Sequence, residues 1–381
     1  MKFVCRSLEL LLVALAPLAL FPCATCAQHY NRTDLLSDIM GAAPVQDSHL
    51  VNAWGLSRSS TSPWWVSDNG TGLTTLYTGA GAIVPINGTG FVTIPAPKNA
   101  PAGTIATPTG TVYNGSSTDF ILPAPNGKAA TFMFCTEDGT ISGWNGGPTA
   151  VIAVDDLEFG KNSSPVYKGM TTADFKGKRY VYVTNFRAGR VEVYDTNFQP
   201  VHFFFGAFDP NEGDDYGEHI PRGFAPFNIQ NIGGSLFVTY AKQDSSRHDD
   251  VAGDGNGFVE IFTSGGRHIA HLQHGPWLNS PWGVVWTPRD FGEFSNTILV
   301  GNFGSGKIAA FNGFTYQFMG FVKNPDDSTL VIDGLWALAF GNGANAGPST
   351  TLYFTAGPSD ESHGLFGMLT AVAAEQDGDE E

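Results

Sequence analysis

The chain has 381 residues, of which 47 are glycine, 13% are aromatic and only 15% are charged. This composition predicts many short β-strands joined by tight turns, and it excludes a mainly helical or a disordered protein. The net charge is −16 with only 20 Lys and Arg residues. We therefore expect neither nucleic acid nor an anionic membrane as a partner, because each requires a basic face.

The first 27 residues have the pattern of a secretory signal peptide. Lys2 and Arg6 precede an apolar run over residues 8–21, and small residues follow up to Ala27. The run is shorter than the roughly 20 residues that a membrane-spanning helix needs. We predict cleavage after Ala27 and a secreted, extracellular protein without membrane insertion, or a periplasmic or cell-surface protein in a bacterium. A lipid anchor on Cys23 or Cys26 is the alternative.

A short element recurs six times along the rest of the chain. It consists of an aromatic or polar residue, a small residue and then apolar positions, and the small residues are separated by 55, 59, 59, 55 and 54 positions. A regular period of this length indicates repeated units that each contain several strands. The small residues are Gly55, Gly110, Gly169, Asn228, Gly283 and Ala337.

Further strand signals follow inside each unit. Apolar or alternating segments predict second strands at residues 64–67, 132–135, 180–184, 236–239, 298–301 and 352–355. Glycine-rich turns precede predicted third strands at residues 189–194, 257–262, 306–311 and 364–372. Four strands in each of six units is the composition of β-propeller blades.

The last unit ends soon after its third strand. We therefore predict that a strand near residues 30–36 completes the last blade and closes the ring. Residues 28–372 then form one all-β domain, a monomeric six-bladed β-propeller, and residues 373–381 form a disordered acidic tail. A β-sandwich or a β-helix is the structural alternative, but neither predicts so long and regular a period.

Two features of the mature chain bear on its chemistry. Cys135 is its single cysteine and lies in an apolar strand, so we expect a buried, inert thiol and no disulfide. Five sequons predict a glycoprotein with exposed acceptors if the source glycosylates. The acceptors are Asn31, Asn69, Asn87, Asn114 and Asn162.

Seven short motifs rich in glycine and aromatic residues span nearly the whole mature chain. They are residues 50–55 (LVNAWG), 240–244 (YAKQD), 248–253 (HDDVAG), 278–283 (LNSPWG), 299–304 (LVGNFG), 333–337 (DGLWA) and 363–367 (HGLFG). These motifs resemble those of a widespread family of secreted six-bladed β-propellers, with Ala53 where that family usually has proline. The resemblance implies the fold and export, and it assigns no activity.

The start of each inner strand is similar, more distantly, to NHL-type and gluconolactonase or regucalcin-like propellers. That resemblance implies a divalent metal held over the channel by Glu, Asn and Asp, two of them at the middle position of a Pro-x-Gly pattern. A hard cation needs such oxygen ligands, and this chain has none of these residue types at the middle positions. Those positions are Trp54, Thr109, Lys168, Phe227, Trp282 and Trp336.

We expect ligands to bind on the face where the loops between second and third strands open. In unit four this loop carries His248, Asp249 and Asp250, and in unit six it carries Glu361 and His363. Imidazole and carboxylate groups together bind divalent cations, so these five residues are predicted metal ligands, with an ion such as Ca²⁺ as the cofactor. The alternative is a solvated acidic loop with incidental histidines.

The middle positions provide a second set of candidates on the same face. Trp54, Lys168, Phe227, Trp282 and Trp336 start inner strands near the channel mouth, where flat rings stack on a sugar or an apolar ligand. The alternative is that the rings fill the channel and pack between blades. Polar residues after second strands, such as Asp68 and Asn69, are interpreted as turn residues.

These observations leave two functions open. The first is a binding or interaction propeller that holds an extracellular carbohydrate or protein on its acidic, aromatic-centred face. The second is a metal-dependent extracellular hydrolase or lyase that uses the same face. The sequence contains neither a Gly-x-Ser-x-Gly nucleophile motif nor a phosphate-binding glycine loop.

Overall fold

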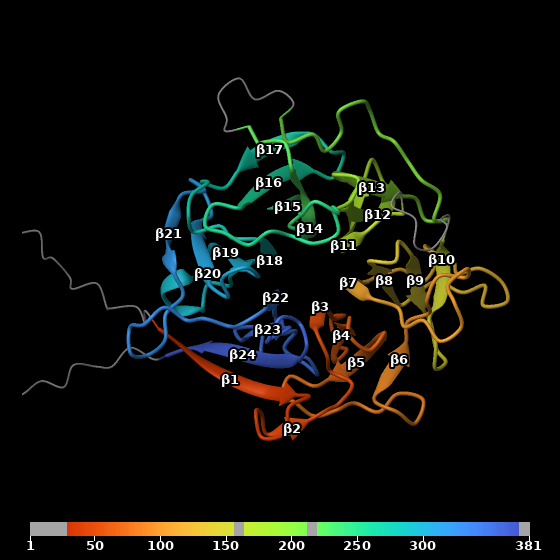
Figure 1. The fold of residues 1–381 in the computed structure, drawn as a ribbon, viewed down its shortest axis with the longest axis horizontal. Coiled ribbons are helices and arrows are strands. Elements are labelled where there is room, and N and C mark those ends of the chain that lie inside the picture. Colours follow the sequence, from red (N-terminus) through yellow and green to blue (C-terminus); the bar gives the residue numbers. More distant parts are fainter. Residues whose placement is uncertain (1–28, 156–163, 212–218, 373–381) are drawn as a thin grey trace, which may run out of the picture.

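The computed structural model describes residues 29–155, 164–211 and 219–372. Six β-sheets are arranged in a ring around a centre (Figure 1), which confirms the all-β, six-bladed propeller. Helical structure among these residues is limited to the 3-10 turn η1 (Gly292–Phe294), and no described helix is long and apolar enough to cross a membrane. The predicted signal peptide, the acidic tail and the sequon at Asn162 lie outside the described residues.

The first three blades follow one another along the chain, each as an antiparallel sheet. Blade one contains β3 (Ala53–Ser57), β4 (Trp64–Asp68), β5 (Leu73–Tyr77) and β6 (Phe91–Thr93). Blade two contains β7 (Pro108–Tyr113), β8 (Phe132–Thr136), β9 (Ile141–Trp144) and β10 (Val151–Val154). Blade three contains β11 (Tyr167–Phe175), β12 (Lys178–Asn185) and β13 (Arg190–Tyr194).

The last three blades continue the ring. Blade four contains β14 (Phe224–Ile232), β15 (Ser235–Lys242), β16 (Gly257–Thr263) and β17 (His268–His271). Blade five contains β18 (Pro281–Trp286), β19 (Thr297–Asn302), β20 (Ile308–Asn312) and β21 (Phe318–Phe321). Blade six contains β22 (Leu335–Phe340), β23 (Leu352–Ala356) and β24 (Leu365–Ala371) from the end of the chain.

The start of the described chain completes blade six, as predicted. Strand β1 (Tyr30–Ser37) pairs antiparallel with β24, from Tyr30 opposite Ala371 to Ser37 opposite Leu365, and lies beside it in Figure 1. The short strand β2 (Val45–Gln46) adds a parallel fifth strand to this sheet. The ring is therefore closed by hydrogen bonds between the two ends of the propeller.

Blade three differs from the expectation of four strands, because its described sheet ends at β13. The chain that follows makes one bridge to β13, between Tyr194 and Pro200. Proline has no backbone N–H to donate to a ladder, so Pro200 interrupts the pairing that a fourth strand would require.

The small residue of the repeat has a steric reason. A Cβ atom at Gly110 would lie 2.6 Å from the backbone nitrogen of Met170, and one at Gly283 would lie 2.7 Å from the carbonyl oxygen of Trp336. Each of these glycines therefore touches the inner strand of the next blade. The period read from the sequence is the period of these blade-to-blade contacts.

Buried apolar side chains fill the space between neighbouring blades. Among the described residues, six clusters each join two adjacent blades, and a seventh lies at the centre of the ring. Between blades one and two, for example, Trp65 stacks on Phe132 with ring centroids 4.4 Å apart. Cys135 is fully buried between blades two and three, and burial raises the pKa of its thiol to about 12, which confirms a buried thiol.

Two of the predicted glycosylation acceptors are not exposed. Asn69 and Asn114 are buried, and the side-chain nitrogen of Asn114 donates to three backbone carbonyls. The expectation of exposed acceptors is therefore wrong for these two positions. The Asn114 side chain turns inward to satisfy backbone carbonyls, and that of Asn69 bonds to the side chains of Asn52 and Glu137. Asn31 and Asn87 are exposed, and their glycosylation stays a prediction.

Candidate functional site at the channel mouth

Consecutive strands of a blade run in opposite directions, so the start of each inner strand and the loop between the second and third strands lie at the same end. At this end, side chains from different blades meet over the central channel. They form two layers, an inner layer of aromatic rings and an outer layer of charged and amide groups.

The inner layer, called here the aromatic plug, is tightly stacked. Trp336 stacks against Trp54 on one side, with ring centroids 3.7 Å apart, and against Phe303 on the other at 3.9 Å. Its members are Trp54, Phe186, Phe227, Trp282, Phe303 and Trp336. Below it lies a cavity of about 30 Å³ between inner strands.

Four members of the plug are the predicted ligand-binding aromatics. Trp54, Phe227, Trp282 and Trp336 are each 5% exposed or less, because their faces cover one another. The structure gives these rings a packing role at the floor of the mouth. Their direct contact with a ligand stays a prediction.

Lys168 connects the two layers. Its side chain is only 2% exposed, and its Nζ lies 5.0 Å from the centre of the Trp54 ring. Nζ forms ion pairs with Glu137 and, at 3.3 Å, with Asp249. A buried cation is costly unless it is paired and hydrogen-bonded, and the two carboxylates supply that pairing.

The outer layer, called here the mouth network, is a continuous chain of hydrogen bonds and ion pairs. Asn52 donates to Glu361 at 2.7 Å and to Asn69 at 3.3 Å, and Asn69 donates to Glu137 at 2.8 Å. Beyond Lys168, Asp249 lies 2.8 Å from Nδ1 of His248. The members are Asn52, Asn69, Glu137, Lys168, His248, Asp249 and Glu361, from blades one, two, three, four and six.

The loop that carries Glu361 is strained. Ser359, Asp360 and Glu361 are three consecutive non-glycine residues with positive φ, at 58°, 51° and 64°. The left-handed conformation costs about 1–2 kcal/mol for each such residue. Strain of this kind persists where the surrounding structure fixes the local conformation. Here the strained loop places the Glu361 carboxyl 2.7 Å from the side-chain nitrogen of Asn52.

Burial and neighbouring charges shift the acid–base properties of Glu361. Burial raises the pKa of this carboxyl to about 7, and the negative charge of Glu137 adds to the effect, while Lys168 opposes it. Glu361 therefore exchanges a proton near neutral pH, which suits a general acid or base.

The opposite side of the mouth has different electrostatics. The hydrogen bond to Asp249 raises the pKa of His248, although burial works against it. The same bond, together with Lys168, lowers the pKa of Asp249 in spite of partial burial. Burial alone would lower the pKa of Lys168, but the carboxylates of Glu137 and Asp249 raise it, so its ammonium group stays charged.

The predicted metal ligands are only partly brought together. Ligand atoms of His248 and Asp249 lie within 4.8 Å of each other and of Glu137. The negative charge of Asp249 also contributes, after burial and Glu137, to the raised pKa of Glu361. Asp250 follows Asp249 in the chain, and burial raises the pKa of its carboxyl, while Lys168 opposes this shift. His363 is instead bonded to Asp38 at 2.8 Å.

Sequence reasoning missed Glu137, Asn52 and the network role of Asn69. Glu137 lies in the turn between β8 and β9, which is the second-to-third-strand loop of blade two. The rule that identified the loops of blades four and six applies equally to this turn, so the signal was present. Asn69 was interpreted as a turn residue only, whereas its side chain also bridges Asn52 and Glu137.

Sequence comparison finds relatives without a described activity, and no family model matches the chain. Uncharacterized protein R648 of Acanthamoeba polyphaga mimivirus is 27% identical over 341 residues, which cover 88% of this chain and 78% of that protein. Uncharacterized protein L690 of the same virus is 27% identical over 331 residues, covering 85% of this chain and 81% of that protein.

Solved structures share the fold. The soluble aldose sugar dehydrogenase of Escherichia coli is 10% identical with a TM-score of 0.50, covering 90% of this chain and 100% of that chain. A streptogramin B lyase structure is 11% identical with a TM-score of 0.47, covering 90% of this chain and 98% of that chain. At 10% identity, the similarity to the aldose sugar dehydrogenase shows the propeller fold alone. The resemblance to a family of secreted propellers, with its motifs, stays a prediction.

Proposed function

We propose that the protein is an exported binding propeller that holds a hydroxyl-rich ligand, a carbohydrate, in the mouth network. The observation that carries this proposal is the convergence of amide, ammonium, imidazole and carboxylate groups from five blades above one aromatic floor. Such groups donate to and accept from sugar hydroxyls, and a few fixed polar groups over an apolar floor are typical of small-ligand sites. Export rests on the signal-peptide pattern of the first 27 residues.

Pre-formed hydrogen bonds favour this function. The Asn52 amide is oriented by its hydrogen bond to Asn69, and the Asn69 amide by its hydrogen bond to Glu137. The Nε1 atom of Trp336 also donates to Asn52 at 3.0 Å. A ligand then meets groups that are already ordered, so little conformational entropy is lost on binding.

Glycan arrays and pull-downs from the secreted proteome, with wild type and two variants, test this proposal. Glu137→Gln removes one network charge, and Asp290→Asn removes an exposed charge from the loop between β18 and β19 at the other end of blade five. We expect a glycan hit that Glu137→Gln weakens by at least about tenfold, corresponding to one charged hydrogen bond, and that Asp290→Asn leaves unchanged. Binding of proteins only would replace the carbohydrate with a protein partner, and no binding would refute the proposal.

A metal-dependent hydrolase or lyase is the second candidate. Glu137, His248 and Asp249 approach one another closely enough to share an ion, and Glu361 beside them titrates near neutral pH. Lys168 argues against this candidate, because its ammonium group already pairs with both carboxylates of this set, Glu137 and Asp249. Metal analysis of wild type and Asp249→Asn, with ester and lactone substrates before and after chelation, decides it. Activity that requires a metal and is lost in the variant would favour the hydrolase.

A further inference from the structure

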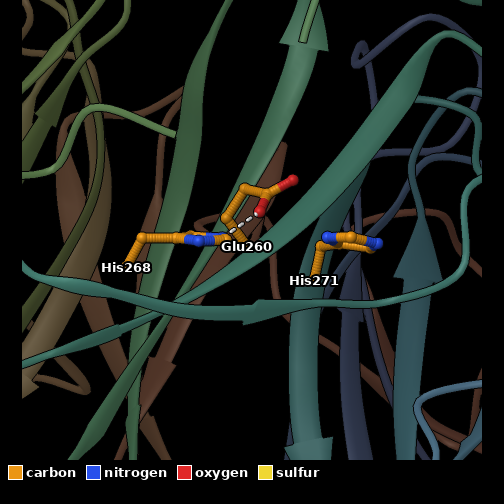
Figure 2. Close-up of side chains that lie close together, drawn as sticks. All are labelled: Glu260, His268 and His271. Carbon is orange, nitrogen blue, oxygen red and sulfur yellow. Dashed lines mark hydrogen bonds and ion pairs between the residues drawn. The ribbon is translucent and has the colours of Figure 1, made fainter. Parts of the chain in front are cut away.

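A second cluster of ligating side chains lies in the outer part of blade four, on different strands from the mouth network. Glu260 on β16 and His268 and His271 on β17 place one ligand atom each within 4.8 Å of the others. Figure 2 shows the Glu260 carboxylate between the two imidazole rings. The Nε2 atom of His268 lies 2.7 Å from Oε2 of Glu260.

A β-bulge brings the two histidines to one face. Residues three positions apart on a regular strand point to opposite faces of the sheet. Here His271 pairs with Glu260 and His268 pairs with Phe262, with a register shift between Ile261 and Phe262. The extra residue restores a common face for His268 and His271. Bulges commonly re-aim side chains next to functional sites.

Burial gives a second, independent observation. The Glu260 side chain is 4% exposed and that of His268 is 11% exposed. The hydroxyl of Tyr240 on β15 is buried and has no hydrogen-bond partner among the described residues. Val238 on β15 pairs with Glu260, and Tyr240 lies two positions further along β15, so its side chain is on the same face of the sheet as Glu260. A buried, unpartnered hydroxyl on the same face as the Glu260 carboxylate is a group that a bound polar species would satisfy.

We propose that Glu260, His268 and His271 bind one Zn²⁺ ion that clasps the outermost strand of blade four to its neighbour. Two imidazoles and one carboxylate are a common zinc ligand set, with a water molecule in the fourth position. Ca²⁺ and Mg²⁺ prefer oxygen ligands, so two nitrogen ligands select against them. Binding requires neutral imidazoles and an ionised carboxylate, so the affinity for zinc should fall at acidic pH. This site goes beyond the proposed function.

Isothermal titration calorimetry of chelator-treated protein with Zn²⁺ tests the proposal. We expect one bound equivalent in the wild type, and an affinity at least about tenfold weaker in His271→Ala and in Glu260→Gln. Two controls should keep the wild-type affinity. His202→Ala removes an exposed histidine of blade three, and Asp249→Asn changes the mouth network.

Each outcome decides the question. No binding by the wild type, or unchanged binding by His271→Ala, overturns the proposal. Loss of binding in Asp249→Asn moves the ion to the mouth network and also overturns it. If the cluster variants fail to fold, the imidazole ¹⁵N resonances of the wild-type protein provide the readout. Zn²⁺ must then shift those of His268 and His271 and leave that of His202 unchanged; any other pattern refutes the site.

Discussion

At the scale of single residues, Lys168 is the side chain on which the electrostatics of the channel mouth depend. It is buried at the level of the aromatic plug and neutralises Glu137 and Asp249. Without the Lys168 ammonium group, the carboxyl groups of Glu137, Asp249 and Glu361 would lie above the aromatic plug without this cation among them.

Lys168→Met should therefore destabilise the protein strongly, by about 3–5 kcal/mol, because it leaves the buried carboxylate of Glu137 without its cation. Adding Glu137→Gln should recover part of this loss, since it removes one unpaired charge. Urea unfolding of Lys168→Met, Glu137→Gln and the double variant measures the coupling free energy between Lys168 and Glu137. A loss below about 1 kcal/mol in Lys168→Met would show that the ion pairs are solvated.

Glu361 predicts how stability depends on pH. Its carboxyl has a pKa of about 7 in the folded protein and an ordinary value of 4.5. Below about pH 4.5 both the folded and the unfolded state hold the proton, and between 4.5 and 7 only the folded state does. The unfolding free energy contributed by Glu361 is therefore largest at acidic pH and falls as pH rises to 7.

Glu361→Gln removes this dependence and keeps the shape of the side chain. The difference in unfolding free energy between wild type and variant should change by up to about 3 kcal/mol between pH 4.5 and 7.5. Denaturant unfolding at several pH values measures it. A difference that stays constant over this range would contradict the assigned environment.

At the scale of elements, the inner strands show which part of the repeat is structural. The small residue of each unit was predicted as a register mark, and the structure explains it by the approach of the next inner strand. In blade four Asn228 takes this position, and its side-chain amide donates to the carbonyl oxygen of Trp282 at 2.7 Å. A polar residue is tolerated there because it bonds to the next blade.

Gly110→Ala should cost about 1–3 kcal/mol, because its Cβ would lie 2.6 Å from a backbone nitrogen that cannot move freely. Ala337→Gly at the same repeat position of blade six is the matched control, with an expected cost of at most about 1 kcal/mol. Thermal unfolding compares the two. An equal or smaller cost at Gly110 would mean that the blades move apart readily.

The strands were predictable from the sequence, but the loops were only partly so. Glycine turns, alternating apolar residues and the period located the strands and the closing strand near Tyr30, because these signals are local. Of the mouth network, the sequence suggested Lys168, His248, Asp249 and Glu361 as candidate site residues. It did not suggest Asn52, Glu137 or the bridging role of Asn69. Which residues join the mouth network depends on which loops converge in space and on strained backbone, as at Ser359 to Glu361. Neither can be read from a local sequence pattern.

At the scale of the whole molecule, β1 holds the ring closed. Tyr30, Leu35 and Leu36 are buried, and the Tyr30 hydroxyl donates to the carbonyl oxygen of Phe291 at 2.8 Å. Each fully buried side chain of this size contributes about 1.5–3 kcal/mol. The closing strand therefore carries a large part of the net stability.

A chain that begins at Asp38 lacks β1 and should lose cooperative unfolding, with a lower Tm. A synthetic peptide of residues 29–38, added in trans, should restore both by pairing with β24. A peptide of the same composition in scrambled order is the control. A truncated chain that unfolds like the full protein would show that the ring does not depend on this strand.

The most direct test of the channel mouth as a desolvated site, assembled from several blades, is an NMR titration of Glu361. The ¹³Cδ resonances of labelled glutamate, assigned by comparison with Glu361→Gln, report its protonation. A midpoint near 7 is expected, and Lys168→Met should raise it further because the ammonium group opposes the shift. A midpoint near the ordinary value of 4.5 would mean that water fills the mouth, and it would contradict the site.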